Sequence, residues 1–147
     1  MIDLHPLVTH FPIVLFFVYA IFEIMAKYKP DYDKLAFGFL IAGLIFALLS
    51  VLTGNLAHQI YKENTINGGI GIDEAIELHE NLATYTLFYY LGVLVLKFYF
   101  TIKKKTEKKF RLLIIILALL GLVLVVYTGL YGGILVFKNG IGVSFIN

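Results

Sequence analysis

Four apolar stretches, each about as long as a bilayer is thick, dominate this 147-residue sequence. They lie near residues 8–26, 35–57, 81–102 and 111–137, and a helix needs roughly 20 apolar residues to cross the hydrocarbon core. Inside lipid every backbone polar group must be bonded within the protein, so each stretch is predicted to be a helix. We therefore predict an all-α protein, a transmembrane four-helix bundle with up-down-up-down topology and a single domain over residues 1–147.

Composition supports a membrane location. Apolar residues make up 60% of the chain and charged residues 15%, whereas soluble domains have about 45–50% and about 25%. The chain has no cysteine, which excludes disulfides, thiolate metal sites, cysteine-ligated iron–sulfur clusters and a covalently attached c-type haem. The first residues lack a basic region and no small-residue cleavage site follows, so we expect the first stretch to be a retained span.

The distribution of lysine and arginine predicts the orientation in the membrane. Ten of the twelve basic residues flank the first and third connections between the apolar stretches, and only Lys62 and Lys138 lie on the other side. Basic residues concentrate on the cytoplasmic side of bacterial inner-membrane proteins. Both termini and the 58–80 connection are then predicted to face outward, into the periplasm. We expect the lysine run at 103–109 to set this topology and not to bind nucleic acid.

All four histidines of the chain are predicted to gather at this outer end. His5 and His10 open the first stretch, His58 closes the second and His79 begins the third. In an up-down-up-down bundle these three places lie at the same membrane face. Imidazoles are ligands for haem iron and for copper, zinc and non-haem iron, so the cluster indicates a bound metal or haem.

The preferred arrangement is a haem with His10 and His79 as its axial ligands. The first and third helices of such a bundle lie diagonally, and a haem b needs two ligands and an apolar slot but no covalent attachment. In a helix that already includes His5, five positions turn it about 140° away from His10. His5 and His58 are therefore the reserve pair, for a second haem b or for a bare metal ion.

Several glycines lie at the same depth as the histidines. Gly54 comes one turn before His58, and Gly129, Gly132 and Gly133 occupy the corresponding part of the fourth stretch. Together they could form a smooth face for a macrocycle. Small residues are also common wherever membrane helices pack closely, which is the alternative explanation.

A weak internal repeat relates the two halves of the chain. Residues 53–54 and 128–129 are both Thr-Gly, near the ends of the second and fourth stretches. Aligning the two helical hairpins also brings His10 near His79. Repeats related by an axis along the membrane normal would explain the match.

Both ends of the chain resemble a known family. Residues 5–13, HPLVTHFPI, resemble the H-P-x-x-x-H-F-P-I opening of domain of unknown function 2231, a family of small bacterial predicted membrane proteins. Residues 132–143, GGILVFKNGIGV, resemble its G-G-x-L-V-Y-x-x-G-x-G-V close, with Phe137 where tyrosine is usual. The resemblance covers the whole chain and implies a four-span inner-membrane protein without an established activity. The four histidines and Gly54 fall at positions of the family pattern.

The leading functional hypothesis is a cytochrome b-like electron carrier, more a redox subunit than a stand-alone enzyme. Haem at the outer leaflet would pass electrons between membrane quinone and a periplasmic redox protein. One shallow haem cannot carry electrons across the bilayer, so we expect a homo-oligomer or a subunit of a larger complex.

Two other hypotheses remain open from the sequence. One is a non-haem protein that binds or transports copper, zinc or iron through all four histidines. Against transport, the spans below the histidines are almost wholly apolar, and Glu23 and Lys97 lie near the opposite end, where we expect them to reach the interface by snorkelling. The other is a structural membrane assembly protein whose histidines only cap helices.

Overall fold

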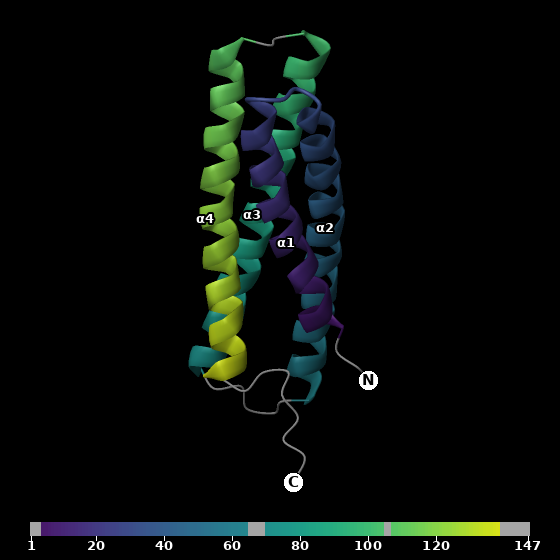
Figure 1. Cartoon of the computed structure of the whole chain (residues 1–147). Coiled ribbons are helices and arrows are strands. Elements are labelled where there is room, and N and C mark those ends of the chain that lie inside the picture. Colours follow the sequence, from purple (N-terminus) through teal and green to yellow (C-terminus); the bar gives the residue numbers. More distant parts are fainter. Residues whose placement is uncertain (1–3, 65–69, 105–106, 139–147) are drawn as a thin grey trace.

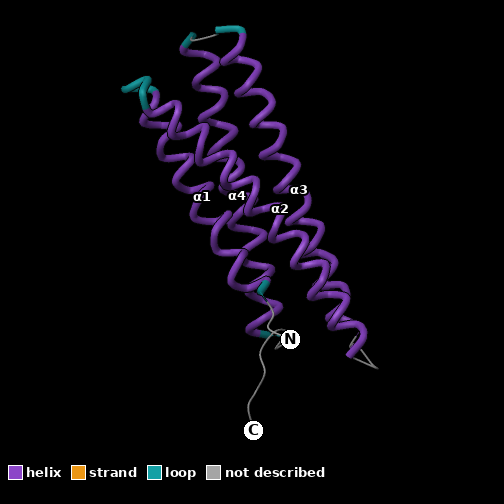
Figure 2. Tube along the Cα trace, turned by 90° about the vertical axis from the view of Figure 1, so that its right-hand side faces the viewer, coloured by secondary structure: helices purple, strands orange, loops and turns teal. Residues whose placement is uncertain are grey.

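The structure, a computed structural model, describes residues 4–64, 70–104 and 107–138. Four helices form it: α1 (His5–Ala26), α2 (Tyr32–Asn64), α3 (Ile70–Ile102) and α4 (Lys108–Phe137). They run alternately up and down, so that α1 and α3 begin at the end of the bundle where α2 and α4 finish (Figure 1). No strand occurs in the described residues (Figure 2). The predicted all-α four-helix bundle is confirmed.

The helices form a ring in which each packs against two neighbours. α1 packs against α2 and α4, and α3 packs against the same two helices, so α1 and α3 lie diagonally across the bundle axis. The most extensive packing is within the α1–α2 hairpin. A side chain that reaches the axis from α1 therefore faces α3. This diagonal relation decides which residues of the two helices can meet inside the bundle.

All four helices are long and apolar enough to cross a membrane. Each contains the corresponding apolar stretch, and α2 and α3 continue past it at the histidine end. Large apolar side chains cover the outside of the bundle, among them Val14, Ile45, Val95 and Leu120. An apolar surface of this extent suits lipid and not water.

Two aromatic rings from the diagonal helices meet in the middle of the bundle. Phe16 of α1 stacks on Tyr90 of α3, with ring centroids 3.6 Å apart and planes within 2° of parallel. Glycines on the other two helices leave room for these rings. A Cβ atom on Gly43 of α2 would lie 2.7 Å from Phe16 Cε1, and one on Gly121 of α4 would lie 2.6 Å from Tyr90 Cζ. The large rings of α1 and α3 therefore require small residues on α2 and α4.

We predict that Gly121→Val destabilises the bundle, because the added side chain overlaps the Tyr90 ring. Overpacking of this kind costs about 1–3 kcal/mol. The measurement is the free energy of unfolding from SDS titration in mixed micelles. Gly92→Val is the matched control, since a Cβ on Gly92 meets nothing within 4 Å. Equal losses for the two variants would contradict the overlap as the cause.

Candidate functional site

His5 and His79 meet across the bundle axis. His5 opens α1 and His79 lies in the first half of α3. Their ring centroids are 6.3 Å apart, and the ring planes cross at 71°. Both residues are partly buried between the helices. Since α1 and α3 are diagonal, two imidazoles face each other from opposite sides of the bundle interior.

Hydrogen bonds to the neighbouring helices orient both rings. His5 Nδ1 lies 3.2 Å from Thr53 Oγ1, and this hydroxyl already donates its hydrogen to the Leu49 carbonyl at 2.9 Å. His5 Nδ1–H is therefore the donor to Thr53. His79 Nδ1–H donates to the Thr128 carbonyl at 3.1 Å. With the hydrogen on Nδ1, the lone pair of each neutral ring lies on Nε2, the nitrogen that can bind a metal.

Each of these rings rests on a glycine of the second helix in its hairpin. A Cβ atom on Gly54 would lie 3.0 Å from His5 Cε1, and one on Gly132 would lie 2.9 Å from His79 Cε1. The glycines thus let α2 and α4 approach the imidazoles closely. Of the glycines predicted to line the site, these two contact a histidine.

The other two predicted glycines lie farther from the pair. Gly129 borders the space below the histidines, and a Cβ there would only touch Ile13 at 4.0 Å. A Cβ on Gly133 would meet nothing within 4 Å. Gly133 therefore does not contact the histidine pair, and it provides a natural control for Gly132.

His10 lies outside the pair. It is exposed on the bundle surface, and its Nδ1–H donates to the Pro6 carbonyl one turn earlier at 2.6 Å. Five helical positions rotate a side chain by about 140°, so a helix that directs His5 to the axis turns His10 outward. The threonines of the internal repeat each contact one of the two histidines, Thr53 with His5 and Thr128 with His79. The repeat therefore relates His5, and not His10, to His79.

His58 forms a separate pair with Glu80. Its Nδ1–H donates to the Glu80 carboxylate at 2.9 Å, and both side chains are partly buried. Its Nε2 is buried and has no hydrogen-bond partner among the described residues. A carboxylate that holds one imidazole nitrogen is the usual support for a histidine whose other nitrogen binds a metal.

Two hollows adjoin the histidine pair inside the bundle, with volumes of about 90 and 80 Å³. His5 and His79 line both of them. The larger hollow extends toward Phe16, and the smaller one extends toward His58 and Glu80. Small side chains leave this space open: Ala47, Ser50, Ala83 and Thr86.

The four histidines do not converge on one point. Within residues 4–64, 70–104 and 107–138, no three histidine or acidic side chains are arranged to hold a single metal ion. The structure instead brings together two pairs, His5 with His79 and His58 with Glu80.

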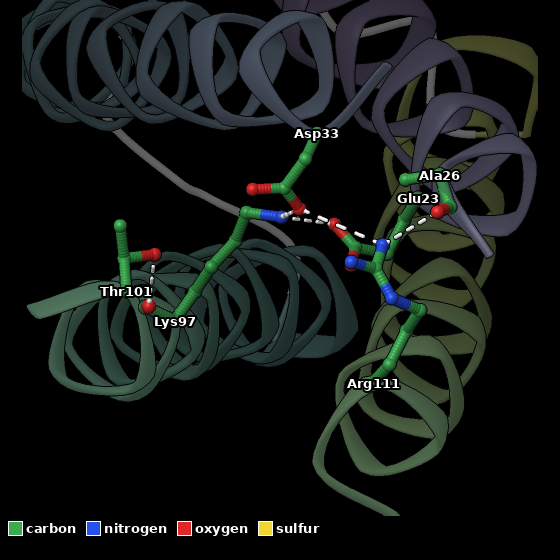
Figure 3. A network of polar contacts seen from close by, with 6 residues as sticks. All are labelled: Glu23, Ala26, Asp33, Lys97, Thr101 and Arg111. Carbon is green, nitrogen blue, oxygen red and sulfur yellow. Dashed lines mark hydrogen bonds and ion pairs between the residues drawn. The ribbon is translucent and has the colours of Figure 1, made fainter. Parts of the chain in front are cut away.

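A charged cluster that the sequence did not predict lies near the ends of α1 and α3, at the opposite end of the bundle. Figure 3 shows its residues from close by. The Lys97 ammonium of α3 forms ion pairs with Glu23 of α1 and, at 2.9 Å, with Asp33 of α2. The side chains of Glu23 and Lys97 are only 3% and 4% exposed. The prediction that they snorkel to the interface is wrong, because each finds its counter-ion inside the bundle. A charge in the hydrocarbon needs such a partner.

Arg111 of α4 completes this cluster. Its Nη1 donates to the Ala26 carbonyl at the end of α1 at 2.7 Å and lies 4.0 Å from Asp33 (Figure 3). A cavity of about 320 Å³ adjoins these residues. A sequence signal existed: Glu23 and Lys97 are opposite charges near the same ends of the first and third spans.

The molecule is thus a membrane-spanning four-helix bundle with paired imidazoles at one end and paired charges at the other. It belongs to the family described as predicted membrane protein (DUF2231), whose model matches residues 1–145. The resemblance seen in the end motifs is confirmed. No curated protein and no solved structure matches the chain.

We predict that Lys97→Met strongly destabilises the protein, because it leaves two carboxylates without their shared cation. Breaking a buried ion pair on one side costs roughly 3–5 kcal/mol. The double change Glu23→Gln with Lys97→Met should recover much of that loss, since it removes one stranded charge. Unfolding in SDS-containing micelles measures both, with Lys103→Met at the exposed turn as control. A double variant no more stable than the single one would contradict this account.

Proposed function

We propose that this protein is a haem b-binding membrane electron carrier and that His5 and His79 are its axial ligands. The observation that carries the proposal is the pair of imidazoles facing each other from diagonal helices at 6.3 Å. Two rings bonded to opposite sides of one metal ion, at about 2 Å for each metal–nitrogen bond, have centroids roughly 6 Å apart. Haem b bound there would supply a one-electron Fe(III)/Fe(II) couple.

The residues around the pair fit this role. Thr53 and the Thr128 carbonyl hold the Nδ1–H groups, so each Nε2 carries the lone pair that a ligand histidine needs. Gly54 and Gly132 let α2 and α4 approach the two rings closely. The walls of the adjoining hollows are mainly apolar, as a slot for haem b requires. The donor set and its supporting hydrogen bonds therefore suit an axial pair.

The hollows beside the histidine pair are too small to admit a haem without a change in the structure. The hollows, at about 90 and 80 Å³, are smaller than the roughly 300–1,000 Å³ of typical ligand sites. Admitting a macrocycle requires the two hairpins to move relative to each other where they border these hollows. Each hairpin contains one histidine together with the group that accepts its Nδ1–H, so this movement breaks neither hydrogen bond.

We extend the proposal to the orientation of the protein in the membrane and to its redox partners. Ten of the twelve basic residues lie around the connections at the charged end, which supports an inner-membrane location with that end in the cytoplasm and both termini in the periplasm. The histidine site then serves exchange between membrane quinone and a periplasmic redox protein. A site near one face needs a second cofactor to move electrons across the bilayer. We therefore expect the protein to act as an oligomer or as a subunit of a larger complex.

A specific observation favours one alternative, a non-haem metal site. His58 has a carboxylate on Nδ1 and a buried Nε2 without a hydrogen-bond partner in the described residues. It borders the same hollow as His5 and His79. Movement of His58 toward that pair would make a three-histidine site for copper, zinc or iron. Elemental analysis of the purified protein separates this alternative from haem.

We predict that the detergent-purified protein shows a Soret band and, after dithionite reduction, sharp α and β bands of six-coordinate haem b. His5→Ala and His79→Ala should each abolish the six-coordinate spectrum, because each removes one axial ligand. His10→Ala is the matched control and should leave the spectrum unchanged, since His10 points away from the axis. Absence of a Soret band after haem supplementation during expression would refute the haem proposal.

We also predict that Gly132→Ala weakens haem retention, because the new methyl group would stand 2.9 Å from the His79 ring. The expected loss is on the order of 10-fold, as for other changes to groups that orient a metal ligand. Haem transfer to apomyoglobin measures retention. Gly133→Ala should retain haem as the parent protein does, and an equal effect of the two changes would mean that the ring contact is not the cause.

A further inference from the structure

A groove lies between the end of α1 and the start of α4, at the charged end of the bundle. Its volume is about 740 Å³. Three basic side chains line it, and they come from both helices: Lys27, Lys108 and Arg111. Ala26, Leu112 and Ile115 form its apolar wall. We propose that this groove binds an anionic phospholipid, with the phosphate on the three basic groups and an acyl chain along the apolar wall.

The charge of the groove selects an anionic headgroup. Among the described residues that line it, none is acidic. The nearest carboxylate to Arg111 is that of Asp33 at 4.0 Å, and Asp33 is already paired with Lys97. Lys27 and Lys108 are exposed. Three cations gathered without an acidic neighbour in the groove repel one another, and a phosphate group relieves that repulsion.

Arg111 is held in place before any ligand binds. Its Nη1 donates to the Ala26 carbonyl at 2.7 Å, and its other neighbour is the buried ion-pair cluster (Figure 3). A guanidinium offers five N–H donors, of which this hydrogen bond uses one. Arginine binds phosphate through two parallel hydrogen bonds where its plane is fixed. The internal cluster therefore orients a phosphate-binding group on the surface.

The position of the groove selects a lipid over a soluble anion. The groove lies where two membrane-crossing helices end and begin, which is the level of lipid headgroups. Its wall continues along α4 through Leu112 and Ile115 toward the hydrocarbon. Tyr28 at its rim is 75% exposed, as expected for an aromatic residue at the membrane interface. Basic pockets between membrane helices are sites for anionic headgroups.

The test uses the full chain, purified and delipidated in detergent. Phosphatidylglycerol or phosphatidylcholine is added in matched amounts, and native mass spectrometry measures the lipid retained. We expect preferential retention of phosphatidylglycerol. The double variant Lys27→Gln with Lys108→Gln should reduce it roughly 30-fold, since each basic residue near an anionic lipid contributes on the order of fivefold in affinity.

The matched control, Lys103→Gln with Lys109→Gln, removes the same charge from exposed positions that do not line the groove. It should retain phosphatidylglycerol like the parent protein. Equal losses in the two double variants would overturn the site in favour of diffuse electrostatic attraction. Equal retention of both lipids would overturn it too. Displacement of the lipid by millimolar inorganic phosphate would identify the groove as a site for a free anion. Circular dichroism checks that the variants fold. If the double variant does not fold, Lys108→Gln alone should reduce phosphatidylglycerol retention about fivefold, and this single change then tests the site.

Discussion

Contacts between α1 and α3 across the bundle axis organise this protein, although the backbones of these two helices do not pack against each other. Only large or charged side chains can bridge that distance. They do so in three layers: His5 with His79, Phe16 and Tyr19 with Tyr90, and Glu23 with Lys97. The candidate site is thus one layer of a structural pattern that runs the length of the bundle.

The helices between them, α2 and α4, contribute the complementary small residues. In the α1–α2 hairpin His5 rests on Gly54, and in the α3–α4 hairpin His79 rests on Gly132. Close approach of this kind is what holds membrane helices together, because lipid offers no hydrophobic driving force between them. The same glycines that allow packing also set where each imidazole stands, so packing and candidate function depend on the same positions.

The bundle has a polar cluster near each end, and the two clusters differ in chemistry. Polar side chains cannot face hydrocarbon without a partner, so they turn toward the axis. At one end these are imidazoles, held by a hydroxyl and a backbone carbonyl. At the other they are full charges around Lys97. The stacked rings of Phe16 and Tyr90 lie between the two ends.

Length and hydropathy alone determined the number of helices, their approximate limits, the membrane environment and the gathering of histidines at one end. These properties are local, since each stretch must be helical in lipid whatever its neighbours do. The end motifs likewise identified the family. Tertiary structure decided which histidines meet, because His5 and His10 differ by about 140° around one helix and only packing against α2 and α4 fixes how α1 is rotated. It also decided that Glu23 and Lys97 pair inside the bundle and do not extend to the interface. These residues are 74 positions apart in the chain, and they become an ion pair only when the diagonal helices face each other.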